Sequence, residues 1–80
     1  MTTPSEEYFA LVLDRIKPAE DLETVVEHYT EKHGRPPRKV LLHPHAKGRN
    51  VEAVIQAAEA LGLPVERDKS LLVWEVWVGG

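Results

Sequence analysis

The residues best suited to chemistry stand together in one short stretch, residues 43–50, which reads His-Pro-His-Ala-Lys-Gly-Arg-Asn. Imidazoles accept protons or bind metals, and lysine and arginine neutralise phosphates and carboxylates. A loop that leads into a helix also presents free backbone N–H groups to anions, here those of residues 51–53. The sequence therefore predicts an anion-binding loop. Its candidate ligands are Lys47, Arg49, Asn50, His43 and His45.

Metal binding and catalysis have less support in this stretch. His43 and His45 form a His-x-His pair, but a zinc site needs at least three protein donors, and residues 43–50 contain no carboxylate. The chain has no cysteine, which excludes a thiolate nucleophile and a cysteine-ligated metal. The Walker, dinucleotide-binding and Gly-x-Ser-x-Gly patterns are absent. We expect no catalytic residue, no metal and no cofactor.

Charge is distributed unevenly along the chain. Residues 32–51 hold six Lys or Arg, three of the four His and no acid, whereas residues 1–31 hold eight acids against two bases. Such a positive segment attracts anions, nucleic acid or the acidic surface of a partner. Nucleic acid is disfavoured, because the net charge is −3, no known nucleic-acid-binding motif is present, and Trp74 and Trp77 lie outside the basic segment.

The elements that must position this loop are a strand and a helix. Residues 38–43 contain a compact apolar run closed by Pro44, which predicts a strand. Asn50 is a favourable N-cap, and apolar residues recur at helical spacing over residues 51–61. Residues 65–67 then read as a second strand. This order predicts a βαβ unit with the loop at the carboxyl end of its first strand.

Two further segments precede this unit. Residues 18–33 predict a helix that begins at Pro18 and is capped by Gly34, with a buried stripe of Leu22, Val25, Val26 and Tyr29. For the N-terminus, Thr3, Pro4 and Glu6 give a helix-start pattern. If residues 8–16 are helical, one arc holds Tyr8, Phe9, Val12, Leu13 and Ile16, with Leu11 as the misfit. The unbroken apolar run is instead typical of a buried strand. The helix is favoured, with the strand as the alternative.

Residues 65–67 and 71–78 predict a hairpin whose second arm is the central strand. The expected fold is α+β, a small α/β sandwich in the order helix, helix, strand, helix, hairpin, with helices covering a mixed three-stranded sheet. The alternative is a four-stranded sheet in which residues 8–14 form the first strand. The length of 80 residues suits a single domain over residues 1–80.

The last predicted strand is apolar on both faces, so one face needs a further cover. Alternation places Leu71, Val73 and Trp77 together on that face, which is a candidate dimer interface; alternatively, the Trp77 ring packs under the N-terminal helix. We expect a non-enzymatic domain that acts through protein–protein contacts and forms a homodimer. The alternative is an anion- or nucleic-acid-binding module that uses residues 32–51.

Location follows from two absences. The longest apolar run, residues 8–13, is far shorter than the roughly 20 residues that span a bilayer. A chain without cysteine is compatible with a reducing compartment. We expect a cytoplasmic protein without membrane contact.

Overall fold

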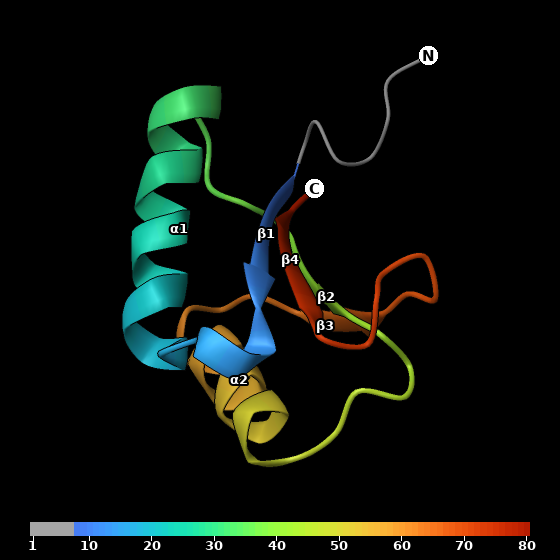
Figure 1. Cartoon of the computed structure of the whole chain (residues 1–80). Helices are drawn as coiled ribbons and strands as arrows, with labels where there is room; N and C mark the ends of the chain where they lie inside the picture. Colours follow the sequence, from blue (N-terminus) through green and yellow to red (C-terminus); the bar gives the residue numbers. More distant parts are fainter. Residues whose placement is uncertain (1–7) are drawn as a thin grey trace.

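The computed structural model describes residues 8–80, which form two helices packed on one face of a four-stranded mixed sheet (Figure 1). The strand order is β1-β4-β2-β3. Strand β4 (Glu75–Gly79) runs antiparallel to β1 (Tyr8–Val12) and to β2 (Lys39–Leu42), while β2 runs parallel to β3 (Val65–Arg67). The predicted α+β class is confirmed, in the four-stranded form that the sequence left as its alternative.

The first segment is a strand and not the favoured helix. Tyr8–Val12 forms β1 and is followed by the short 3-10 turn η2 (Leu13–Arg15). The prediction of a helix over residues 8–16 is therefore wrong, and its capping residues 3–6 lie outside the described residues. The cause is pairing, because β1 matches β4 along its whole length. The alternation of a strand also turns Leu11, the misfit of the helical arc, into the core.

Helix α1 (Pro18–His33) confirms its prediction at both ends. Pro18 stands in the first turn, where its missing N–H costs no helical hydrogen bond. Gly34 adopts the left-handed conformation with φ 71°, and its N–H donates to the Thr30 carbonyl at 2.8 Å. Of the predicted stripe, Leu22, Val25 and Tyr29 are buried and Val26 is half-buried.

The predicted βαβ unit is confirmed in β2, helix α2 (Arg49–Ala60) and β3. The beginning of α2 differs from the prediction, because Gly48 is the N-cap residue and Asn50 lies within the first turn. Gly48 has a φ of 120°, which a residue with a side chain rarely adopts. The chain therefore turns into the helix at the glycine, two residues before the expected cap.

The predicted hairpin is wrong, since β3 and β4 lie on opposite sides of β2. The connecting segment, residues 68–74, passes the end of β2, where the Asp68 N–H donates to the Leu42 carbonyl at 2.8 Å. Strand β4 then enters between β1 and β2, which pairs it on both sides and buries Val76 and Val78. It is thus a central strand, as predicted, but residues 71–74 are not part of it.

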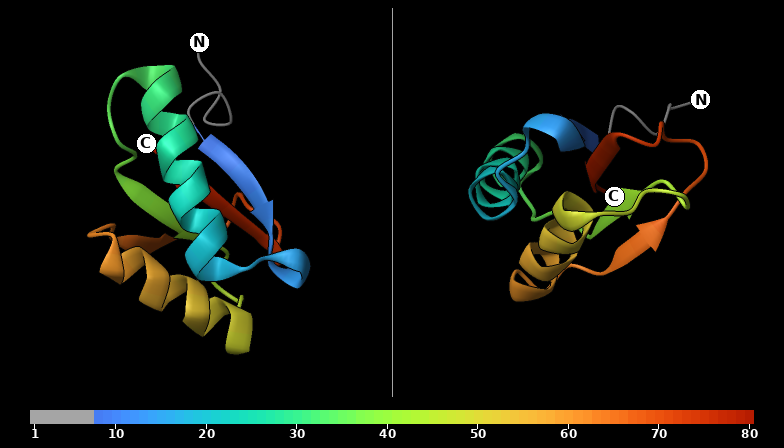
Figure 2. Two further views of the ribbon diagram at one scale, coloured as in Figure 1. Left: turned by 90° about the vertical axis from the view of Figure 1, so that its left-hand side faces the viewer. Right: turned by 60° about the horizontal axis from the view of Figure 1, so that its bottom comes forward.

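Both helices lie on the same side of the sheet and contact each other (Figure 2). The core between helices and sheet includes Leu22, Val40, Leu42, Val54, Val76 and Val78. By alternation, Tyr8, Ala10, Leu41 and Trp77 project to the opposite face, over which the described residues place no helix. Among residues 8–80, no helix has both the length and the apolar character needed to cross a membrane.

Candidate functional site

The loop predicted to bind anions joins β2 to α2 and is held by a residue that sequence reasoning missed. One Nη of Arg67 donates to the carbonyls of His43 and Ala46, at 2.9 and 2.8 Å. The Ala46 N–H also donates to the His43 carbonyl at 3.0 Å. A signal for Arg67 existed in the sequence, because it ends the strand that returns parallel to β2, and parallel strands bring their carboxyl ends to one edge.

The two histidines of the loop interact with each other. The His45 backbone N–H donates to His43 Nδ1 at 3.1 Å, and the two ring centroids lie 5.5 Å apart. His43 is half-buried and His45 is exposed. The bond occupies one of the two nitrogens through which His43 could bind a metal. Residues 8–80 contain no group of three or more His, Cys, Asp or Glu placed to hold a metal ion.

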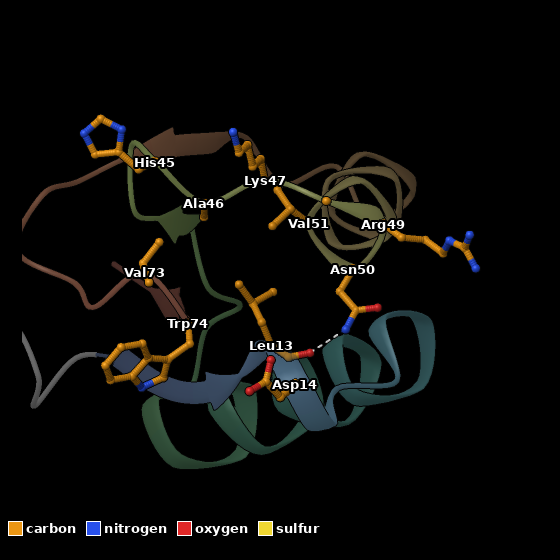
Figure 3. A pocket seen from close by; sticks show the side chains of 11 residues that line it. Leu13, Asp14, His45, Ala46, Lys47, Arg49, Asn50, Val51, Val73 and Trp74 are labelled. Atoms are coloured by element: carbon orange, nitrogen blue, oxygen red, sulfur yellow. Dashed lines mark hydrogen bonds between the residues drawn. The ribbon is translucent and has the colours of Figure 1, made fainter.

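Asn50 has a different task from the predicted one. Its side-chain Nδ2 donates to the Leu13 carbonyl at 2.7 Å, as Figure 3 shows, and so ties α2 to η2. The first hydrogen bond of the helix runs from the Glu52 N–H to the Gly48 carbonyl at 3.0 Å. The backbone N–H groups of residues 49–51 therefore have no helical acceptor, so that Val51 is the one residue of the predicted 51–53 that keeps a free N–H within the helix.

A pocket of about 460 Å³ opens beside the loop (Figure 3). One side carries the basic residues His45, Lys47 and Arg49, but not His43. The other side carries the Trp74 indole and Val73, which follow the crossing from β3. The remaining lining is Leu13, Asp14, Ala46, Gly48, Asn50 and Val51. The pocket thus joins basic side chains to an exposed aromatic ring.

Tertiary pairing explains why Trp74 reaches the basic loop. The Leu13 N–H donates to the Trp74 carbonyl at 2.8 Å, which extends the β1–β4 ladder by one residue beyond the strands. The Asn50 bond brings the beginning of α2 to the same Leu13. Leu13 therefore links the two sides of the pocket. Trp74 is 24 positions from Asn50 in the chain, so the sequence gives no local signal that the two residues line one pocket.

The charges around the pocket do not all favour an anion. Lys47 and Arg49 are exposed, and Figure 3 shows the Arg49 guanidinium extending away from Trp74. Asp14 lines the same pocket with a carboxylate, which repels a bound anion. Of the predicted ligands, His45, Lys47 and Arg49 lie at the pocket with side chains for which no hydrogen bond to described residues is seen.

The three predicted interface residues occupy different environments. Trp77 projects to the uncovered face of the sheet, where its ring centroid lies 5.6 Å from that of Tyr8. Val73 is 42% exposed, whereas Leu71 is only 2% exposed and is unavailable to a partner. Three other large apolar side chains are strongly exposed and were not predicted as interface residues: Val12, Leu72 and Trp74. Together with Val73 they form what we call the corner patch.

Comparisons with models of protein families, with curated proteins and with solved structures found no match.

Proposed function

We propose that this protein acts through protein–protein contacts and that it associates with a second copy of itself through its sheet. The observation that carries this proposal is the corner patch. Its four large apolar side chains are 47%, 51%, 42% and 49% exposed, in chain order. Exposed apolar residues are ordinary when scattered, but a group of them beside an uncovered sheet face is typical of an interaction surface.

Backbone hydrogen bonds bring the chain positions of the corner patch close together. Val12 stands opposite Glu75 in the β1–β4 register, next to the Leu13–Trp74 hydrogen bond. The Glu75 N–H donates to the Leu72 carbonyl at 3.0 Å, and the Glu75 carboxylate accepts from the Leu72 N–H at 2.7 Å. These bonds hold residues 72–74 against the end of β1. The apolar side chains are therefore presented by an ordered segment.

The charges at the corner patch permit a second copy as the partner. The corner patch itself carries no charge, so two chains that are each negative overall can meet there without opposing like charges. It also adjoins the edge of β1, whose five residues are all uncharged.

We place the protein in the cytoplasm, where a chain without cysteine suits the reducing conditions.

Sedimentation velocity over about 1 µM to 0.1 mM tests self-association. We expect a concentration-dependent dimer, because a dissociation constant near 1 µM corresponds to about 8 kcal/mol, a modest interface. The variant Trp74→Ser removes an exposed indole and leaves the backbone carbonyl that Leu13 needs. Truncating a hot-spot tryptophan costs about 2 kcal/mol or more, which is about 30-fold for each copy. Because the homodimer loses two indoles, the dissociation constant should rise at least about 30-fold.

The matched control is Leu61→Ser, which removes an exposed apolar side chain at the far end of α2. This variant should dimerise as the parent does. A protein that stays monomeric at 0.1 mM would refute self-association, and equal weakening by both variants would show that the corner patch is not the contact.

A second candidate function is supported by the pocket. It brings Trp74 to the same hollow as Lys47 and Arg49, and an aromatic ring beside cations is the arrangement that binds single-stranded nucleic acid through base stacking and phosphate contacts. We propose this as the alternative activity, since the Asp14 carboxylate in the same pocket opposes it.

Fluorescence titration with a single-stranded oligonucleotide at 50 and 200 mM salt checks this alternative. We expect binding that weakens steeply with salt and is lost in the Lys47→Glu, Arg49→Glu double variant. Lys69→Glu, an equal change of sign at an exposed residue outside the pocket, serves as the control and should retain most of the binding. Binding that the double variant leaves unchanged would eliminate this activity.

A further inference from the structure

We infer that two copies of this chain pair antiparallel along their β1 edges, with a twofold axis at Ala10, to form one continuous eight-stranded sheet. The inference rests on the proposed self-association and places it at the β1 edge, which contains the Val12 member of the corner patch, in a defined register. It follows from the contrast between the two sheet edges, the direction of the free backbone groups and the self-complementarity of β1.

The two edges of the sheet differ in their protection. Edge strands usually avoid unwanted pairing by being short, by carrying charge or by adjoining proline. Strand β3 has all three features, with three residues, Pro64 before them, and exposed Glu66 and Arg67. Strand β1 has five residues, Tyr-Phe-Ala-Leu-Val, with no charge and no proline. Within its own bounds, β1 is therefore the less protected of the two edge strands among the described residues.

Alternate residues of β1 form hydrogen bonds to β4, which identifies the backbone groups that point to the outer edge of the sheet. Leu13 donates to Trp74, so odd-numbered residues of this segment face β4. In an antiparallel ladder the hydrogen-bonded pairs recur every second residue. The N–H and C=O groups of Tyr8, Ala10 and Val12 consequently point away from β4, to the outer edge. Three residues of β1 thus offer both a donor and an acceptor to a further strand.

These three residues complement themselves in an antiparallel arrangement. With Ala10 opposite Ala10 of the second copy, Tyr8 lies opposite Val12, and each pair exchanges two backbone hydrogen bonds. The small Ala10 side chain causes no crowding on the axis. Aromatic and β-branched side chains are favourable cross-strand partners, so Tyr8 of one copy covers Val12 of the other. This pairing buries the Val12 member of the corner patch.

A second copy fits this edge better than an unrelated strand for a reason of symmetry. A twofold contact uses the same surface twice, so its residues must match one another in reverse order. The sequence of β1 does so, because Phe9 meets Leu11 on the core side and Tyr8 meets Val12 on the other. Apolar side chains therefore meet apolar side chains on both faces of the joined sheet.

Two substitutions at Ala10 test the edge by sedimentation. Ala10→Lys places two like charges against each other on the axis, and Ala10→Pro removes an edge donor without removing a bond inside the monomer. We expect both to raise the dissociation constant at least tenfold. Gln56→Lys, the same charge added at an exposed position of α2, should have no effect. Circular dichroism establishes that each variant is folded.

Single cysteines test the register in a chain that has none of its own. Paired residues have Cα atoms about 5.5 Å apart, within the range of a disulfide, so an oxidised mixture of Tyr8→Cys and Val12→Cys should form a mixed disulfide dimer. Each of these variants alone should link poorly, because residue 8 lies four positions from residue 8 of the other copy. Ala10→Cys alone should link to itself.

The outcomes separate this inference from the proposed function. A parent protein that remains monomeric overturns both. A dimer that persists in Ala10→Lys and Ala10→Pro, and that yields no link between positions 8 and 12, overturns edge pairing and leaves self-association through the uncovered face. Loss of dimer in both Ala10 variants, together with the mixed disulfide, supports both the edge and its register.

Discussion

Asn50 could cap the helix or donate to a neighbouring element, and the two roles predict different effects of aspartate on stability. At an N-cap, aspartate serves as well as asparagine, because either oxygen accepts from the helix. In the structure the Asn50 amide donates to the Leu13 carbonyl, which aspartate cannot do. We expect Asn50→Asp to lower the free energy of unfolding by about 1 kcal/mol, the usual net value of a hydrogen bond, as measured by urea denaturation. Gln56→Glu, an exposed amide-to-acid change, is its control; an unchanged stability for Asn50→Asp would favour the capping role.

Tyr29 buries a hydroxyl group without a hydrogen-bond partner among the described residues. Its ring packs edge-on against Phe9, with ring centroids 6.0 Å apart, and at a tilt against His33, with ring centroids 4.2 Å apart. Phenylalanine would keep both contacts. Because burying an unpaired hydroxyl costs about 1 to 3 kcal/mol, Tyr29→Phe should raise the free energy of unfolding by about 1 kcal/mol. Urea denaturation measures it, and a clear loss of stability would show that the hydroxyl is bonded.

Asp68 contributes to the loss of stability at low pH. The Ser70 backbone N–H donates to its carboxylate at 2.8 Å and, with the Ser70 side chain, holds the pKa of Asp68 below its ordinary value of 3.8. The folded state therefore binds this proton less readily than the unfolded state. The resulting stabilisation is complete above the unfolded pKa and is lost as the pH falls through the folded pKa.

The variant Asp68→Asn checks this sign. Thermal midpoints measured from pH 6 down to pH 2.5 should fall less steeply below pH 4 for the variant than for the parent. The two curves should be parallel above pH 5, where the carboxylate is charged in both states. A variant that falls as steeply as the parent would show that Asp68 does not contribute.

At the scale of elements, the connection from β2 to α2 depends on β3. The Arg67 guanidinium bonds to two carbonyls of the loop and so ties the end of β3 to the beginning of the pocket. Hydrogen bonds from charged groups contribute about 1.5 to 3 kcal/mol when partly buried, and solvent reduces this at an exposed arginine. The loop conformation is thus a product of the parallel β2–β3 pairing.

We expect Arg67→Met, which keeps the aliphatic stem, to lower the free energy of unfolding by about 1 to 2 kcal/mol. Amide hydrogen exchange should accelerate mainly in residues 43–48, because the loop loses its tie before the sheet does. Lys69→Met, a neighbouring exposed cation with no such bond to the loop, should leave both measurements unchanged. Equal effects from the two variants would attribute the change to charge alone.

Residues 8–80 form two layers, and within this part of the chain one face of the sheet and the β1 edge are left uncovered. Because association stabilises the folded state by mass action, the thermal midpoint of the parent should rise with protein concentration between about 1 µM and 0.1 mM. In Ala10→Lys the midpoint should not depend on concentration. Differential scanning fluorimetry provides the measurement, and a flat parent curve would argue against a dimer coupled to folding.

The features that could be predicted from the sequence are those that depend on residues close together in the chain. Pro18 and Gly34 act within one helical turn, so both ends of α1 were predictable. The apolar run from Tyr8 to Leu13 is compatible with the spacing of a helix and with that of a strand. Its partner β4 stands more than 60 residues away in the chain, so local spacing could not decide between the two. The hairpin prediction failed likewise, because the chain order of residues 65–78 cannot show that β2 separates the two strands.

The sequence by itself determined the α+β class, helix α1, the βαβ unit and the basic loop, since each depends on periodicity, capping and charge among near neighbours. Only the tertiary structure decided that β1 is an edge strand, that Trp74 joins Lys47 at one pocket, and that Asn50 and Arg67 hold the loop. The physical reason is that strand pairing and side-chain bonds between elements gain their free energy from residues distant in the chain. Their partners become identifiable only when the sheet order is known.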